Sequence, residues 1–243
     1  MKVRFLGSGD AFGSGARFQT CIHVESGASQ LLLDCGASSL IAMRRFGVDP
    51  QAVDTVILSH LHGDHFGGVP FLILDGQFKR RTRPLLVAGP PGVEKRVREA
   101  MEVFFPGSTR IVRKFETRFV ELADRVAVEV GPVHVTGYEV SHASGAPPFA
   151  LRITGEGKVV TYTGDTEWTE SLVDAARGAH LFIAEALSYD KRIRYHLDLA
   201  TLLEHRSRLD CRRLILTHMG EDLLARLDGV AVEAAEDGKQ LLV

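Results

Sequence analysis

The 243-residue sequence has little of what would assign it at once to a specialised class of protein. Its three cysteines, Cys21, Cys35 and Cys211, are widely spaced and form no Cys-x-x-Cys pair, which argues against a disulfide framework and for a reducing compartment. No apolar run approaches the length of a membrane span, and the opening apolar run is too short for a signal peptide. The formal net charge of -2 gives no general attraction to nucleic acid or anionic membranes. These absences favour a cytoplasmic protein without a membrane partner.

The residues that are present have the composition of an ordinary folded protein. Hydrophobic residues make up 45% of the chain and charged residues 25%. The length suits one sizeable domain and no linker divides the chain, so we expect residues 1–243 to form a single domain. Runs typical of strands, with interspersed helical segments, fall into an early block (residues 1–105) and a late block (residues 110–243). This pattern predicts an α/β sandwich of layered sheets.

One stretch of the early block carries a concentration of positive charge. We expect a helix from about Asp64 to Leu74, followed by a polar connection over residues 76–83. In that connection the run Lys79–Arg83 holds four basic residues. A solvated loop is the simpler interpretation of such a run. The alternative is an anchor for the phosphates of an extended substrate.

The densest group of metal-binding side chains lies in residues 60–65 (HLHGDH), just after an apolar run that predicts a buried strand. Imidazole and carboxylate are ligands that suit zinc, manganese and iron. In extended backbone alternate side chains point the same way, so His60 and His62 can converge on one ion. Asp64 and His65 fall at the turn into the next helix and face a different point. This geometry favours two adjacent ions, for which four ligands are too few.

Three further candidate ligands, His142, Asp165 and His218, stand where predicted strands end, which is where scaffolds build sites. Taken singly, such a histidine often only satisfies nearby backbone groups. An aspartate can bridge two ions through its two oxygens, whereas a histidine cannot. We therefore expect one ion on His60, His62 and His142, and the other on Asp64, His65 and His218, with Asp165 bridging. A shared water or hydroxide would complete both coordination spheres.

Two other positions have an open interpretation. His196 follows a polar loop downstream of Glu185, which ends a predicted strand, so His196 could donate a proton to a leaving group while Glu185 holds its ring. Asp34 closes an apolar strand, and either caps the predicted helix Ser38–Phe46 or supports a metal ligand. The remaining histidines have no ligand neighbour at useful spacing and are expected to be structural: His23, His134, His180 and His205.

The order of these candidate ligands resembles the metallo-β-lactamase superfamily. The signature His60-x-His62-x-Asp64-His65, followed by His142, Asp165 and His218, matches the five-motif order of that superfamily across nearly the whole chain. The resemblance implies an αβ/βα four-layer sandwich, in which two facing mixed β-sheets are covered by helices on the outside. It also implies a dinuclear metal site at the mouth between the sheets.

Within the superfamily the sequence is similar to ribonuclease Z and its phosphodiesterase relatives. Leu33–Gly36, Ser59–Gly68 and Tyr162–Thr166 resemble the first, second and fourth motifs of that group. Glu185-Ala186 resembles the start of its Glu-Ala-Thr segment. His196 then matches the histidine that contacts the scissile phosphate in that group.

Three departures from ribonuclease Z bear on the substrate. Cys35-Gly36 continues as Ala-Ser-Ser instead of Gly-Thr-Gln, and His196 is followed by Leu-Asp instead of Ser-Thr. Only 22 residues separate His142 from Asp165. In the transfer-RNA enzymes this interval carries a long flexible arm that grips the transfer-RNA body. Phosphodiester chemistry is therefore expected without tight recognition of folded transfer RNA.

The expected function is metal-dependent hydrolysis of a phosphodiester, ribonuclease Z-like, on a small or cyclic phosphodiester or an RNA end. Two cations about 3.5–4 Å apart would lower the pKa of a bridging water toward roughly 7 and provide hydroxide at neutral pH. Asp64 would orient the nucleophile or accept its proton, and His196 would steady the phosphate or protonate the departing oxygen. One alternative is hydrolysis of another ester, such as a thioester, lactone, lactam or sulfate ester. The other is a metal-stabilised binding protein without turnover.

The expected cofactors are two divalent metal ions, with zinc first and manganese or iron as alternatives, because His/Asp sites accept all three. The expected partner is a phosphodiester-containing small molecule or an RNA end. A homodimer is a further expectation, since relatives of this kind often dimerise.

Overall fold

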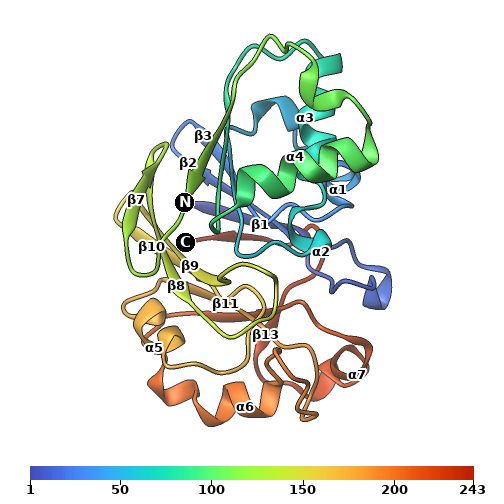
Figure 1. The fold of residues 1–243 in the computed structure, drawn as a ribbon. Coiled ribbons are helices and arrows are strands. Elements are labelled where there is room, and N and C mark those ends of the chain that lie inside the picture. Colours follow the sequence, from blue (N-terminus) through green and yellow to red (C-terminus); the bar gives the residue numbers. More distant parts are fainter.

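The computed structural model describes residues 1–243, whose strands form two seven-stranded mixed sheets (Figure 1). The spatial order in the first sheet is β14 (Gln240–Leu242), β1 (Lys2–Gly7), β2 (Cys21–Ser26), β3 (Ser29–Leu33), β4 (Thr55–Ile57), β5 (Leu85–Gly89) and β6 (Thr117–Glu121). The order in the second sheet is β13 (Glu233–Ala234), β12 (Leu214–Thr217), β11 (Leu181–Glu185), β10 (Lys158–Tyr162), β9 (Phe149–Gly155), β8 (Val133–Glu139) and β7 (Ala127–Val130). The run from β3 to β6 is parallel, as is the run from β10 to β13.

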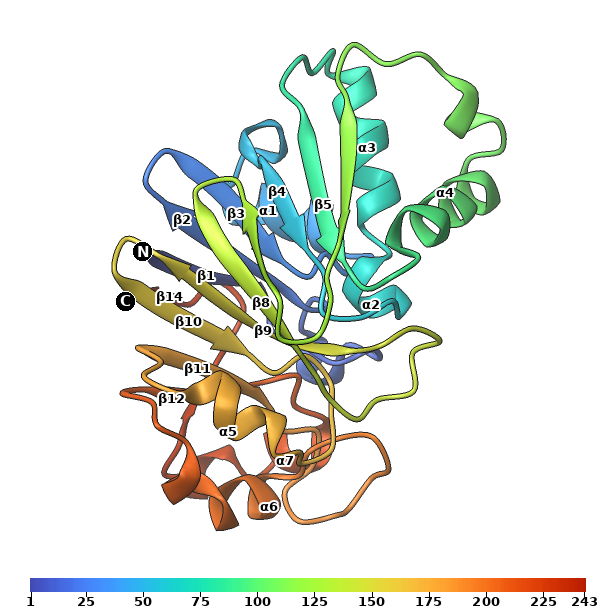
Figure 2. The ribbon, with the colours of Figure 1, turned by 60° about the vertical axis from the view of Figure 1, so that its left-hand side comes forward.

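Helices cover the outer face of each sheet. The helices are α1 (Ser39–Arg45), α2 (Gly63–Phe66), α3 (Val69–Phe78), α4 (Val93–Phe104), α5 (Ser171–Ala176), α6 (Leu199–Glu204) and α7 (Glu221–Leu224). Figure 2 shows α3 and α4 outside the first sheet, and α5, α6 and α7 outside the second. None of the helices combines the length and the apolar character that crossing a membrane requires. The four-layer α/β sandwich that the sequence predicted is confirmed.

The sheets meet in a shared apolar core of 22 buried residues. Because successive side chains of a strand point to opposite faces, Leu31 and Leu33 enter this core together with Ile22 of β2. Leu32 and Cys21 point the other way, into the layer between the first sheet and its helices. Full burial of each large aliphatic side chain stabilises the fold by about 1.5–3 kcal/mol. The alternation therefore holds three layers of packing together.

The sheets do not coincide with the two blocks seen in the sequence. From the late block, β6 and β14 join the first sheet, and β14 pairs with β1 in antiparallel register, with Val3 opposite Leu241. The turn before β14 is tied to the same end of the chain, because the Asp237 carboxylate accepts hydrogen bonds from the backbone N–H groups of Ser8 (2.9 Å) and Phe18 (2.8 Å). Residues more than 200 positions apart thus stabilise the loop that follows β1.

The prediction of a single helix from about Asp64 to Leu74 is wrong. Two helices, α2 and α3, meet at Gly67-Gly68, and α3 continues to Phe78, into the segment predicted to be a polar connection. Both glycines are close to backbone: a Cβ at Gly68 would lie 2.3 Å from the Gly36 carbonyl oxygen. This close approach separates α2, which begins at Gly63 within the HLHGDH segment, from α3, which runs along the first sheet.

The Lys79–Arg83 loop is not a free basic patch. Arg81 is buried, and its guanidinium donates hydrogen bonds to the carbonyl oxygens of Arg83 (2.7 Å), Val53 (2.7 Å) and Pro84 (2.8 Å). Arg83 forms an ion pair with Asp54. These contacts support the structural interpretation of the run, since two of its four cations hold neighbouring loops in place.

We predict that Arg81→Ala lowers the free energy of unfolding by roughly 3 kcal/mol or more, because several buried carbonyl groups would lose a charged donor. Lys79→Ala, an exposed change in the same loop, should stay within about 0.5 kcal/mol of the parent protein. Urea unfolding followed by circular dichroism measures both variants. Equal midpoints for the two variants would contradict a structural role for Arg81.

Candidate metal centre

All seven candidate ligands lie at one edge of the sandwich, although they come from five segments of the chain. His60 and His62 follow β4, while Asp64 and His65 belong to α2. The other three follow strands of the second sheet: His142 after β8, Asp165 after β10 and His218 after β12. Their ligand atoms form two groups, each with all atoms within 4.8 Å of one another: His60, His62 and His142; and Asp64, His65, Asp165 and His218.

Asp165 lies at the middle of both groups. Its Oδ2 atom is 3.3 Å from Nε2 of His65 and 3.3 Å from Nε2 of His218. The same oxygen is 3.9 Å from Nε2 of His60 and 4.0 Å from Nε2 of His142. Four imidazoles therefore point the same ring atom at one carboxylate oxygen.

Hydrogen bonds behind two of these rings determine which nitrogen carries the proton. Asp34 accepts from the Ser59 backbone N–H and from the Ser59 hydroxyl, both at 2.7 Å. Because that hydroxyl donates to Asp34, it accepts from Nδ1–H of His60 at 3.0 Å. Asp34 also accepts from Nδ1–H of His65 at 2.6 Å. In the neutral rings, Nε2 of His60 and Nε2 of His65 then carry lone pairs directed at the centre.

The same arrangement recurs on the opposite side of the centre. Nδ1–H of His142 donates to the Tyr195 carbonyl oxygen at 2.8 Å. The Thr20 hydroxyl, which donates to the Gly9 carbonyl oxygen, accepts from Nδ1–H of His218 at 3.2 Å. Their Nε2 atoms are left with lone pairs that also face inward. Behind the metal centre, each ring is therefore oriented by a partner of its own.

This concentration of lone pairs and negative charge fits divalent metal ions. Nε2 of His60, Nε2 of His65 and Oδ1 of Asp165 are buried without any hydrogen-bond partner in the protein, a costly arrangement that a coordinated cation would satisfy. Burial, with the neighbouring His65 adding to it, holds the pKa of His60 well below its ordinary value. Burial opposes charge on His65 as well, but the carboxylates of Asp165, Asp34 and Asp64 raise its pKa well above the ordinary value. This corner of the cluster thus attracts positive charge.

Left-handed backbone occurs at three non-glycine residues that border the centre. The φ angles are 58° at Asp34, 69° at Tyr195 and 55° at His218. Such conformations cost free energy and persist where the surroundings demand them, often at functional sites. At Asp34 the unusual backbone turns the carboxylate toward His65 and away from α1, whose N-cap is Ser38. Asp34 therefore supports a candidate ligand and does not cap the helix.

The buried Glu185 and the half-buried His196 form a pair beside the centre. Oε2 of Glu185 lies 3.0 Å from Nδ1 of His196, and the same Nδ1 lies 3.9 Å from Oδ2 of Asp165. Burial alone would lower the pKa of His196, but its hydrogen bond to Glu185 and the charge of Glu185 raise it to about 9. Burial, with the charge of Asp165 next to it, raises the pKa of Glu185. Both shifts favour a proton on the Glu185–His196 pair.

A cleft with a volume of about 550 Å³ opens next to His196, which is within the size range of small-molecule sites. The Trp168 ring forms one wall and stacks on His205, with ring centroids 4.1 Å apart. Arg192 and Arg194 line another side. We did not single out these residues from the sequence, although three cations among residues 191–194 were a visible signal.

The four histidines predicted to be structural lie outside the two ligand groups. His23 is buried in β2 and contacts Gln30, and His180 accepts a hydrogen bond from the Val159 backbone N–H. His134 is exposed on β8, and His205 stacks on the tryptophan ring of the cleft.

Solved structures share this architecture. Human tRNase Z, short form, aligns with a TM-score of 0.82 at 21% identity, over 100% of this chain and 99% of that one. The metallo-β-lactamase fold protein YhfI from Bacillus subtilis aligns with a TM-score of 0.79 at 23% identity, over 99% of this chain and 98% of that one. The two facing sheets and the His/Asp centre at their edge thus define a protein of the metallo-β-lactamase fold.

Within this class, a family model described as Anti-Pycsar protein Apyc1 matches residues 1–230, and the chain belongs to that family. The chain is also similar to ribonuclease Z of Haloferax volcanii, at 28% identity over 304 aligned positions that cover 100% of this chain and 95% of the relative. Ribonuclease Z of Agathobacter rectalis is 25% identical, over 92% of this chain and 89% of the relative. The predicted resemblance to the ribonuclease Z and phosphodiesterase branch is confirmed.

We predict that Asp34→Asn weakens metal binding by about 10–100-fold, because the amide cannot hold Nδ1–H of His65 as the carboxylate does. Titration of the metal-free protein with zinc or manganese against a competing chelator measures the change. Asp49→Asn is the matched control, since Asp49 only caps a short 3-10 turn at residues 50–52. Unchanged affinity in Asp34→Asn would remove this carboxylate from the support of the centre.

Proposed function

We propose that this protein is a dinuclear metal-dependent phosphodiesterase that acts on small phosphodiesters, cyclic ones included. One ion would bind His60, His62 and His142, and the other Asp64, His65 and His218, with Asp165 between the two. Zinc is the ion we propose, because imidazoles and aspartate oxygens suit its coordination. The observation that carries the proposal is the Glu185–His196 pair, which sets His196 beside the candidate centre and in the wall of the adjoining cleft.

When bound, the two ions would lower the pKa of a water and neutralise charge on the phosphoryl oxygens. The chain's own residues supply orientation and a proton. Asp64, whose Oδ2 lies 3.2 Å from Nε2 of His65, is placed to orient the attacking water. The raised pKa of His196 favours a proton on its ring, which the ring can give to the departing oxygen while Glu185 keeps it in position.

The shape of the chain around the centre supports a small substrate. Residues 143–164 form a short loop and the β9–β10 hairpin, with no extended arm. The 304 aligned positions shared with the Haloferax volcanii ribonuclease Z exceed the 243 residues of this chain, so that relative has insertions that this chain lacks. The cleft beside His196 is the size of a small-molecule site. A compact diester therefore fits better than a folded RNA.

We also propose that residues 1–243 act as a single domain, because one core joins both sheets. The three cysteines are free, and two of them are buried, which supports the reducing environment of the cytoplasm as the site of action.

The reaction class is tested by a panel of bis-p-nitrophenyl phosphate, a lactone and a thioester, assayed with the zinc- or manganese-loaded protein. Turnover of the diester that is lost on chelation and restored by metal is expected. Hydrolysis of the lactone or the thioester without any diester turnover would overturn the proposal.

We predict that His196→Ala lowers kcat on bis-p-nitrophenyl phosphate by about 100-fold or more, because the departing oxygen loses its proton donor. Metal content measured by inductively coupled plasma mass spectrometry should stay at the parent level. The control is His205→Ala, which alters the adjoining cleft wall 9 positions further along the chain and lies outside the ligand groups. Unchanged kcat in His196→Ala would remove this histidine from the mechanism.

Metal stoichiometry tests the two-ion assignment directly. We expect two zinc ions per chain in the parent protein and one in His218→Ala, since His218 belongs to only one of the two groups of three that we assign. A parent protein that saturates with a single ion would show that the seven side chains surround one metal and not two.

A further inference from the structure

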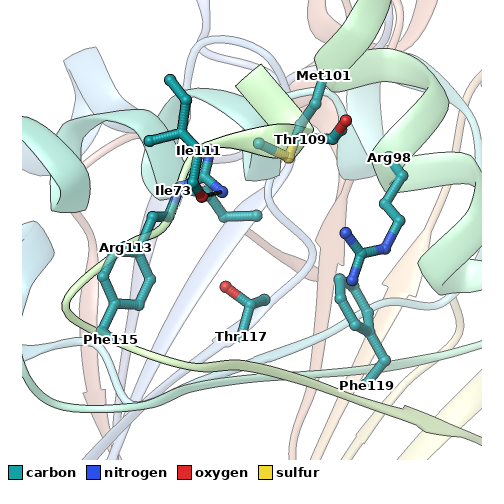
Figure 3. Close-up of a pocket in the computed structure, with 9 residues that line it drawn as sticks. All are labelled: Ile73, Arg98, Met101, Thr109, Ile111, Arg113, Phe115, Thr117 and Phe119. Carbon is teal, nitrogen blue, oxygen red and sulfur yellow. Dashed lines mark hydrogen bonds between the residues drawn. The ribbon is translucent and has the colours of Figure 1, made fainter. Parts of the chain in front are cut away.

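A second cavity lies far from the metal centre, on the outer side of the first sheet. It has a volume of about 190 Å³ and is enclosed by α3, α4, β6 and the segment that joins α4 to β6 (Figure 3). None of its lining residues belongs to the candidate metal centre or to the cleft beside His196. The lining residues are Ile73, Arg98, Met101, Thr109, Ile111, Arg113, Phe115, Thr117 and Phe119.

Hydrogen-bond donors without protein partners face this cavity. Nε of Arg113 is buried and has no partner. The Thr117 hydroxyl makes no hydrogen bond within the protein and points into the cavity between the two arginines (Figure 3). Arg98 binds Glu94 through Nε and Nη2, which leaves Nη1 free. A buried donor without a partner costs free energy that an acceptor in the cavity would recover.

Two arginines bring positive charge to the cavity, and only that of Arg98 is paired with a carboxylate, that of Glu94. Burial lowers the pKa of Arg113, and the nearby charge of Arg98 lowers it further. Arg113 has no carboxylate within ion-pair distance, and its only hydrogen bonds go to the backbone oxygens of Ser108 and Ile111. An anion between the two guanidinium groups would relieve their repulsion and accept from both.

Five of the nine lining residues are apolar. Ile73, Met101 and Phe115 are buried side chains that form part of the lining, and the Arg98 guanidinium lies over the Phe119 ring at 6.0 Å. The volume is well above the share of a single water, about 30 Å³, and below the roughly 300 Å³ of a drug-sized site. A bare inorganic anion would leave this apolar wall unfilled.

We propose that this cavity binds a small organic anion, with its carboxylate or phosphate held by Arg98, Arg113 and Thr117 and its apolar body against Met101 and Phe115. A carboxylate and a phosphate would accept hydrogen bonds from the same three side chains, and they differ only in the number of oxygens that they present. The site is independent of the metal centre and of the proposed activity.

The experiment is equilibrium binding to the zinc-loaded protein, with benzoate and phenyl phosphate as probes, by isothermal titration calorimetry. Acetate supplies the charge without a ring, and benzyl alcohol supplies the ring without a charge. The variants are Arg98→Gln and Thr117→Val. The matched control is Arg118→Gln, which removes an exposed guanidinium from the same strand without touching the cavity.

We expect one benzoate or phenyl phosphate per chain, bound at least ten-fold more tightly than acetate or benzyl alcohol. Arg98→Gln should weaken binding about ten-fold and Thr117→Val several-fold, while Arg118→Gln leaves it unchanged. Binding of benzoate alone would identify a carboxylate as the preferred group, and binding of phenyl phosphate alone would identify a phosphate. Absence of saturable binding by both probes, or binding that is equal in all three variants, would overturn the proposal. Turnover of bis-p-nitrophenyl phosphate, followed in parallel, should be the same in all of them, so a failed anion site leaves the proposed phosphodiesterase untouched.

Discussion

The structure depends on a set of hydrogen bonds that face away from the metal centre. Nδ1 of four histidines is tied to Ser59, Asp34, the Tyr195 carbonyl group and Thr20, so each ring, when neutral, turns an unprotonated Nε2 toward Asp165. Without cations these lone pairs and carboxylates repel one another in a buried space. The fold tolerates the cost because two sheets, joined by a core of 22 residues, hold the segments that carry them. The scaffold therefore prepares the centre before any ion arrives.

Much of this could be predicted from the sequence, because the information is local. Residues 60–65 hold four candidate ligands in one turn of chain, and His142, Asp165 and His218 each follow an apolar strand, where side chains project from a sheet edge. The strands themselves were recognisable by their apolar runs, since a strand buried on both faces has few polar residues. The role of Asp34 could not be decided in this way. Whether it caps α1 or holds His65 depends on a left-handed φ of 58°, which the letters around it do not specify.

Other features escaped prediction because they depend on contacts between distant segments. The break between α2 and α3 at Gly67-Gly68 follows from how closely Gly36 approaches, which cannot be read from the helix itself. The burial of Arg81 depends on carbonyl groups of residues 51, 53 and 84, which meet at its guanidinium only in the folded chain. Likewise, the basic run at residues 191–194 lines a cleft with His196 and Trp168 only because folding brings these segments together. The charge of these basic residues predicts that they lie at the surface of the protein, but it does not predict which other residues they lie beside.

The pairing of β14 with β1 has a consequence for how the molecule comes into being. A ribosome delivers residues 1–7 long before residues 237–242, yet the carboxylate that steadies the loop after β1, and the strand that borders it, both belong to that last stretch. In the same loop, the Ser8 carbonyl oxygen accepts a hydrogen bond from the backbone N–H of His218 at 3.0 Å. During translation, the edge of β1 that pairs with β14 therefore stays unpaired until residues 240–242 have been made. The cation-binding site can form only after both halves of the chain have been translated.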